Sequence, residues 1–203
     1  MQRVRNIIFD LGGVILNIDI KRTEAAFKNL GIEVYSQYLS GNDNASFFKE
    51  YEAGQIDDSV FIKSIQALSP KDLKEEAIID AWNALLLDFP HERIELLQQL
   101  KNKYRLFLLS NTNAIHEKKF QQKLYEQTGS YLEDIFEKTY YSHTIRIRKP
   151  DVEAYRYVIS DNKLVTSETL FVDDTEANMS GAIEAGLQVR HVKPGISILE
   201  MEW

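Results

Sequence analysis

Short runs of apolar residues recur along the chain, separated by longer segments in which apolar residues are spaced three and four apart. An uninterrupted apolar run is typical of a strand buried on both faces of a parallel sheet, whereas the wider spacing indicates a helix with one buried side. Strands and helices in alternation predict an α/β fold, a doubly wound parallel sheet with a Rossmann-like core. The predicted strands are residues 4–10, 105–110, 139–142, 169–173 and 188–192, and the helices between and around the later strands are residues 91–101, 113–127, 152–159 and 177–185.

The alternation is interrupted between Asn17 and about Pro90, where the pattern is helical throughout. A connection between two strands normally needs far fewer residues than this. We therefore predict an inserted all-helical cap, residues 17–88, that lies over the mouth of a core made of residues 1–16 and 89–203. The helices predicted within the insert are residues 23–30, 45–53, 59–68 and 73–87.

Composition narrows the class of protein. The 203 residues are 44% apolar and 27% charged, as in ordinary globular proteins, and the net charge of −7 argues against nucleic acid or an anionic membrane as a partner. The absence of cysteine excludes disulfides, thiolate metal sites and a cysteine nucleophile. The apolar run near the N-terminus is interrupted by Asp10 and has no cleavage site after it, unlike a signal peptide. We expect a cytoplasmic protein, a monomer or weak homodimer, with no membrane association.

Polar clusters follow several predicted strands. Each residue alone has an ordinary explanation as a helix cap or a solvated charge. The carboxyl ends of parallel strands, however, lie on one edge of the sheet, which is where open α/β sheets bind ligands. Together the clusters supply that edge with a carboxylate, a hydroxyl, a cation and an acidic pair: Asp10 before Gly12 and Gly13, Ser110 with Asn111, Lys149 before Pro150, and Asp173 with Asp174.

In their order along the chain and in their residue types, these clusters resemble the four motifs of the haloacid dehalogenase-like hydrolases, which are mostly phosphatases that act through an aspartyl-phosphate. Asp10 matches the first motif, Ser110 the second, Lys149 the third and the pair Asp173 and Asp174 the fourth. The resemblance extends from residue 7 to about residue 190, and the helical insert is similar to the bundle-type cap of that family. The sequence Phe-Asp-Leu-Gly-Gly-Val looks most like the first motif of a subgroup that includes sugar-1-phosphate phosphatases.

The resemblance implies a site in which Asp10, Ser110 and Lys149 are catalytic. A carboxylate nucleophile divides one difficult displacement at phosphorus into two easier steps. Mg²⁺, which prefers oxygen ligands, would offset the repulsion between Asp10 and the phosphate. Its expected ligands are Asp10, Asp174 and the Gly12 carbonyl, with Asp173 as a further candidate, and the phosphate is expected to contact Leu11, Gly12, Ser110, Asn111 and Lys149.

The chain departs from the family at Gly12. Most phosphatases of the family carry a second Asp at this position, where it serves as general acid and base, a role typically worth about 10²–10⁴-fold in rate. A carbonyl that ligates a metal survives the replacement by glycine, but the proton donor does not. Asp19, Glu52 and a metal-bound water are candidate replacements, and residues 51–55 are the part of the insert expected to enter the site. His116 and Asn113 are expected to be helix-surface or capping residues.

We therefore expect a Mg²⁺-dependent phosphatase that hydrolyses a small phosphorylated metabolite, such as a sugar phosphate. One alternative is a weakly active or inactive phospholigand-binding regulator, because of Gly12. Another is a phosphonate hydrolase, which needs a cap lysine for a Schiff base. A phospho-accepting receiver domain and a C–halogen hydrolase fit the pattern less well. Lysines available for the Schiff base are Lys21, Lys28, Lys49 and Lys63.

Overall fold

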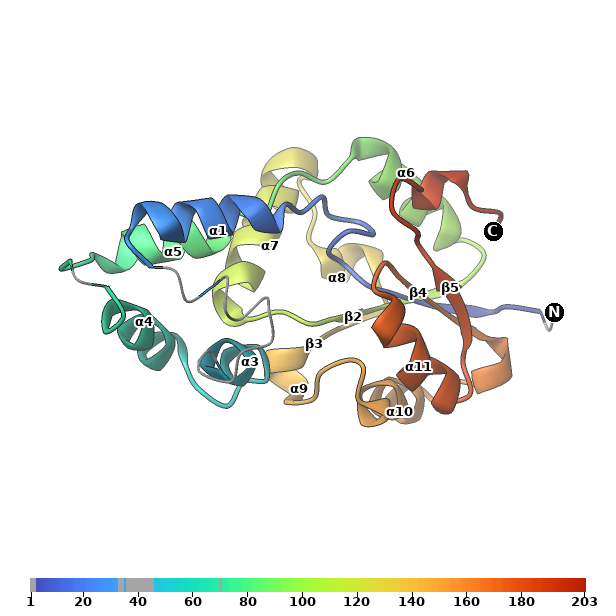
Figure 1. Ribbon diagram of the computed structural model, residues 1–203. Helices are drawn as coiled ribbons and strands as arrows, with labels where there is room; N and C mark the ends of the chain where they lie inside the picture. The colour runs from blue at the N-terminus through green and yellow to red at the C-terminus, as the bar shows by residue number, and fades with distance from the viewer. Residues whose placement is uncertain (1–2, 33–34, 36–45, 70) are drawn as a thin grey trace.

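A five-stranded parallel sheet forms the centre of the computed structural model, which describes residues 3–32, 35, 46–69 and 71–203. The strand order is β3-β2-β1-β4-β5, so that β1 lies in the middle (Figure 1). This arrangement confirms the predicted doubly wound α/β fold. The strands are β1 (Asn6–Phe9), β2 (Arg105–Ser110), β3 (Lys138–Tyr141), β4 (Thr169–Asp173) and β5 (Gln188–His191).

Both faces of the sheet are covered by helices, which explains why β1 is apolar at every position after Asn6. Successive side chains of a strand point to opposite faces. Ile7 and Phe9 therefore pack into one hydrophobic core and Ile8 into another. The first core is completed by α6 (His91–Leu100), α7 (Ala114–Thr128) and α8 (Leu132–Ile135), and the second by α10 (Val152–Asn162) and α11 (Glu176–Glu184) (Figure 1).

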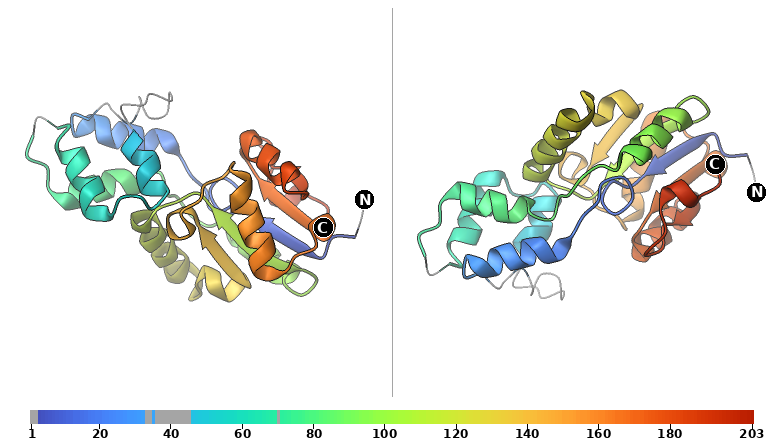
Figure 2. Two further views of the ribbon diagram at one scale, coloured as in Figure 1. Left: turned by 90° about the horizontal axis from the view of Figure 1, so that it is seen from below. Right: turned by 90° about the horizontal axis from the view of Figure 1, so that it is seen from above.

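The helices between β1 and α6 lie together at one end of the molecule, beyond the carboxyl ends of the strands (Figures 1 and 2). They have a separate hydrophobic core rich in aromatic rings, in which Phe27, Phe48, Phe61 and Trp82 are fully buried and in contact. The described helices of this group are α1 (Ile20–Asn29), α3 (Ser46–Glu52), α4 (Asp58–Gln66) and α5 (Glu75–Asn83).

The insert is joined to the sheet through the beginning of α7. The indole Nε1 of Trp82 donates to Oδ1 of Asn113 at 3.1 Å, and Nε2 of His116 lies 3.0 Å from the carbonyl oxygen of Trp82. The Tyr51 hydroxyl accepts from the Ile115 amide at 3.2 Å, and the Ile115 side chain belongs to the core of the insert. The two parts therefore share buried hydrogen bonds as well as apolar contact.

Several predicted boundaries are wrong by a few residues. α1 begins at Ile20 rather than residue 23, because the Asp19 carboxylate caps it by accepting from the Lys21 amide at 3.0 Å. β3 ends one residue earlier than predicted, and Ser142 opens the short helix α9 (Ser142–Ile145). α10 begins at the predicted residue, with Asp151 as its cap, but continues to Asn162 rather than residue 159. Ala45, the first residue of one predicted helix, lies outside the described residues.

Three short elements lie outside the strands and the longer helices. Two are 3₁₀ turns, η2 (Thr166–Glu168) before β4 and η3 (Ile198–Glu200) near the C-terminus. The third is the turn after β1, closed by hydrogen bonds from the amides of Ile15 and Leu16 to the Leu11 carbonyl at 2.9 Å. Within the described part of the chain, every helix is too short or too polar to cross a membrane.

Candidate active site

The sequence-predicted polar residues meet at the carboxyl edge of the sheet. A cavity of about 490 Å³ lies there between the strands and the helical insert. The insert contributes apolar side chains, among them Ile18 and Leu86, and one carboxylate, Glu52. Asp173 lies behind the wall of the cavity and is completely buried. The predicted residues that line it are Asp10, Leu11, Gly12, Ser110, Asn111, Lys149 and Asp174.

Lys149 is the centre of the charged network. Its ammonium Nζ lies 2.7 Å from Oδ1 of Asp10 and 2.6 Å from Oδ2 of Asp173, although these residues are far apart in the sequence. The ring of Phe171 faces the same ammonium group, at 5.4 Å from its centroid. The lysine side chain is almost completely buried, so that its charge is balanced by carboxylates rather than by water.

The side chain of Asn111 holds the main chain of Lys149 in place. The Asn111 side chain accepts from the Lys149 amide at 2.9 Å and donates to the Lys149 carbonyl at 2.8 Å, which occupies both ends of the carboxamide. This arrangement aligns the loop after β2 with the loop that precedes α10. Ser110, the last residue of β2, is buried beside it and lines the cavity.

Both carboxylate oxygens of Asp173 are engaged within the protein. Oδ1 accepts from the Thr175 amide at 2.7 Å, while Oδ2 accepts from Nδ2 of Asn178 at 2.9 Å as well as from Lys149. Asn178 is itself fixed, because its main-chain carbonyl accepts from the Tyr155 hydroxyl at 2.6 Å. Asp173 is thus held as a partner for Lys149, and Asn178 orients it.

Three carboxylates lie close enough to share a cation. One oxygen from each of Asp10, Asp173 and Asp174 lies within 4.8 Å of the others. Gly13 makes this approach possible, since a Cβ atom on it would lie 2.0 Å from Oδ2 of Asp174, and its φ of +75° favours glycine. An oxygen cluster of this kind fits a hard divalent cation such as Mg²⁺.

The electrostatics of the cluster favour such a cation. Burial raises the pKa of Asp10 to about 7, against the lowering effect of Lys149, and the negative charge of Asp173 raises it further. The pKa of Asp174 is also raised, first by burial and then by Asp173. Burial alone would lower the pKa of Lys149, but Asp10 and Asp173 together raise it and keep the lysine charged. A divalent cation would stabilise the ionised carboxylates.

The two candidate proton donors are placed differently. Asp19 caps α1 and lies 3.6 Å from Nε of Arg22, and it is not among the residues that line the cavity. Glu52 does line the cavity, where its carboxylate forms an ion pair with Arg148. The structure therefore favours Glu52 over Asp19 as a group able to reach a substrate.

Arg148 and Ser142 were missed by the sequence reasoning. Arg148 lies beside Lys149 in the chain, which was a usable indication of its position. The buried hydroxyl of Ser142 lies 2.6 Å from the Glu52 carbonyl oxygen and accepts from the Thr112 amide at 2.9 Å. Gly54 allows this contact, since a Cβ there would lie 2.0 Å from the carbonyl oxygen of His143.

His116 was expected on the helix surface and is instead buried against the insert. Its ring stacks on Trp82 with centroids 4.6 Å apart, and Nδ1 lies 3.0 Å from the side-chain nitrogen Nδ2 of Asn113. Burial lowers the pKa of His116 to about 4, so the ring is neutral at pH 7. The expected capping role of Asn113 is confirmed, because its Oδ1 accepts from the His116 amide at 3.0 Å.

The four candidate lysines for a Schiff base all belong to the described part of the chain, and none of them lines the cavity. These lysines are Lys21, Lys28, Lys49 and Lys63.

Comparison with known proteins identifies the family. A model of the haloacid dehalogenase-like hydrolases matches residues 4–186. The chain belongs to this family. One curated relative is D-ribitol-5-phosphate phosphatase of Bacteroides thetaiotaomicron, which is 30% identical over 91% of this chain and 90% of its own length. A sesquiterpene phosphatase of Aspergillus oryzae is 24% identical over 94% of this chain and 90% of its own length.

Solved structures of the haloacid dehalogenase-like family share the whole fold. A family enzyme from Bacteroides thetaiotaomicron superimposes with a TM-score of 0.89 at 34% identity, covering 96% of each chain. The same enzyme has been solved with magnesium and inorganic phosphate, at a TM-score of 0.88 and 33% identity over 98% of this chain and 97% of that one. A predicted family hydrolase from Porphyromonas gingivalis has a TM-score of 0.86 at 29% identity, covering 95% and 92%.

Proposed function

We propose that this haloacid dehalogenase-like hydrolase removes phosphate from a small sugar or polyol phosphate through an aspartyl-phosphate intermediate on Asp10. The observation that carries the proposal is the contact of Nζ of Lys149 with both Asp10 and Asp173, beside a cavity of about 490 Å³. The class of enzyme, a Mg²⁺-dependent phosphoric monoester hydrolase, agrees with the family, the phosphatase relatives and the magnesium and phosphate complex of the Bacteroides enzyme.

In the first step of the proposed reaction, an oxygen of the Asp10 carboxylate attacks phosphorus and the substrate oxygen leaves. Lys149, the Ser110 hydroxyl and main-chain amides of Leu11, Gly12 and Asn111 hold the phosphate oxygens, on which charge is spread in the transition state. The Asn111 side chain already binds the Lys149 main chain, so we assign its contribution to the amide N–H. Water then cleaves the aspartyl-phosphate and regenerates Asp10.

The residues present fit the metal. Asp10, Asp174 and the Gly12 carbonyl are the proposed ligands, and bound Mg²⁺ would neutralise charge between the nucleophile and the phosphate. Asp173 remains a candidate ligand, but its two oxygens already accept hydrogen bonds from three groups. We therefore propose that its main task is to position Lys149.

Residues 17–88 would act as the cap that closes the cavity and selects the substrate. Apolar side chains at Ile18 and Leu86 leave room for a small metabolite, and the carboxylate of Glu52 and the guanidinium of Arg148 offer an acceptor and donors for hydroxyl groups. Because Gly12 supplies no acid, Glu52 is the proposed donor of a proton to the leaving oxygen, a role that requires substrate binding to separate Glu52 from Arg148 so that its carboxyl group can carry a proton. A polyol such as ribitol 5-phosphate, the substrate named for the Bacteroides relative, carries a leaving oxygen that needs such a proton.

A panel of sugar and polyol phosphates, with released phosphate measured in the presence of Mg²⁺, tests the proposal. We expect turnover of at least one polyol or sugar phosphate, and none by Asp10→Asn prepared free of other phosphatases. Release of phosphate by Asp10→Asn at the wild-type rate would contradict the covalent role. Binding of phosphorylated ligands without any release by the wild-type protein would instead favour the regulator.

A further inference from the structure

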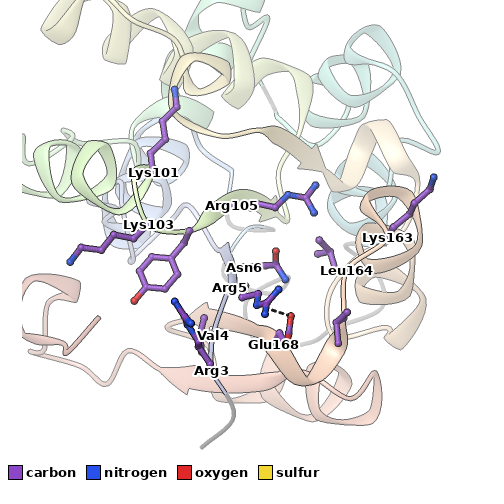
Figure 3. A pocket seen from close by; sticks show the side chains of 12 residues that line it. Arg3, Val4, Arg5, Asn6, Lys101, Lys103, Arg105, Lys163, Leu164 and Glu168 are labelled. Atoms are coloured by element: carbon purple, nitrogen blue, oxygen red, sulfur yellow. Dashed lines mark ion pairs between the residues drawn. The ribbon is translucent and has the colours of Figure 1, made fainter.

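A second hollow, of about 1050 Å³, lies at the amino ends of β1, β2 and β4, on the edge of the sheet opposite the catalytic cavity (Figure 3). Its lining is strongly basic although the whole chain has a net charge of −7. Among the described lining residues, Glu168 is the single acidic one. The cationic residues are Arg3, Arg5, Lys101, Lys103, Arg105 and Lys163.

Some of these cations already have partners. Arg105 forms a bidentate ion pair with Glu137, at 2.9 and 2.6 Å, and Arg5 lies 3.3 Å from Glu168. Lys101 donates to the carbonyl of Asp134 at 2.6 Å, a contact that leaves its charge uncompensated.

The remaining cations are Arg3, Lys103 and Lys163, which are exposed and form no ion pair within the part of the chain that the structure describes. Figure 3 shows Lys103 and Lys163 on opposite sides of the hollow, with Arg3 and Arg5 between them. Their like charges repel one another unless an anion lies among them. A hollow lined by one sign of charge concentrates the field and attracts such an anion.

The backbone at Lys163 makes this residue a suitable one to replace. Lys163 ends α10 with a φ of 53°, in the left-handed region where glycine is favoured and a lysine is strained. The turn itself would therefore be better served by glycine. Replacing Lys163 by glycine therefore removes the charge without opposing the backbone.

We infer that this basic hollow binds an anion with two or more adjacent phosphate groups, such as a polyphosphate chain or a nucleoside di- or triphosphate. Adjacent phosphates carry more negative charge than one phosphate and extend over a greater length, so they can interact with more of these cations at once. Tyr104, which also lines the hollow and is partly exposed, offers a ring face to a nucleotide base. The inference is independent of the phosphatase proposal, because it uses no residue of the catalytic cavity.

Isothermal titration calorimetry of the full chain with tripolyphosphate tests the inference, in buffer without divalent cations because tripolyphosphate binds them. We expect saturable binding that weakens as salt rises, since the Debye length falls from about 10 Å at 0.1 M to about 3 Å at 1 M. Orthophosphate and AMP should bind at least about tenfold more weakly, because a single phosphate forms fewer exposed ion pairs. If ATP binds with the same affinity as tripolyphosphate, the site recognises the phosphate chain alone. If ATP binds more tightly, the site recognises a nucleotide.

Lys163→Gly is the decisive variant, because it relieves the backbone strain and should fold at least as well as the wild-type protein. It should weaken tripolyphosphate binding about threefold to fivefold, as expected for one exposed ion pair. Arg146→Gly is the matched control. Arg146 is also exposed and also ends a helix, α9, in the left-handed backbone conformation, with a φ of 59°, but it lies outside the hollow.

Lys103→Glu should weaken binding further than Lys163→Gly, since it reverses a charge. All three variants should release phosphate from a substrate at the wild-type rate. Equal binding by the wild-type protein, Lys163→Gly and Lys103→Glu would overturn the inference, as would tripolyphosphate binding no tighter than orthophosphate.

Discussion

Gly13→Ala should damage the metal site while Gly12→Ala should not. The added Cβ at position 13 would lie 2.0 Å from Oδ2 of Asp174. Real Cβ atoms essentially never lie closer than 3.0 Å to such an atom, so the carboxylate must move by about 1 Å or more. The φ of +75° adds a cost of about 1–2 kcal/mol for any residue with a Cβ. At Gly12 the Cβ would meet only the end of the flexible Ile18 side chain, at 3.3 Å.

Disturbing the surroundings of a metal ligand typically costs about 10–100-fold in metal affinity or activity. We therefore expect Gly13→Ala to need at least about tenfold more Mg²⁺ for half-maximal phosphate release, with Gly12→Ala within about twofold of wild type. Mg²⁺ titration of the activity, together with urea denaturation of each variant, measures both effects. An unchanged Mg²⁺ requirement in folded Gly13→Ala, with a raised requirement in Asp174→Ala, would refute the role given to Gly13.

The other predictions concern the nucleophile, the leaving group and the buried imidazole. Asp10→Asn should remove turnover but keep the fold, as circular dichroism can check, once deamidation to Asp has been excluded by mass spectrometry. A sugar 1-phosphate should react faster than its 6-phosphate in single-turnover assays. Glu52→Gln should widen this difference by slowing the 6-phosphate more, because the variant lacks the proposed proton donor. An equal difference in both proteins would mean that another residue protonates the leaving oxygen. The unfolded chain protonates His116 near pH 6.5 and the folded protein only near pH 4, so stability should fall by about 2 kcal/mol between pH 7 and pH 5. Urea denaturation of His116→Gln should lack this loss, and identical pH dependence in both proteins would contradict the assignment.

The strands and the edge residues could be predicted because their determinants are local. A strand buried on both faces is a continuous apolar run, and Asp10, Ser110 and Asp173 each end such a run. Parallel pairing then brings those ends together, whatever the helices between them do. The departure at Gly12 was also visible in the sequence alone.

The features that the sequence could not predict depend on contacts between residues from distant parts of the chain or on the exact backbone conformation. His116 is a polar residue within an apolar helix stripe, and only the stacking on Trp82 decides that it is buried. Glu52 and Arg148 are separated by 96 positions, and neither has a local pattern that names the other. Gly12 and Gly13 look equivalent in the sequence, but the hydrogen bond from the Gly13 amide to Leu16, at 2.9 Å, belongs to the turn that gives only Gly13 a positive φ.

The joint at the beginning of α7 makes the helical insert inseparable from the sheet. A chain shortened to the sheet and its own helices would remove the indole that donates to Asn113 and the carbonyl that faces Nε2 of His116. It would also bring Ile115, now 7% exposed, into water. Although the insert has its own aromatic core, it and the sheet lose buried polar partners together, and we therefore expect them to unfold as one cooperative unit. An insertion that reads in the sequence as an added module is, in its energetics, part of the domain that it interrupts.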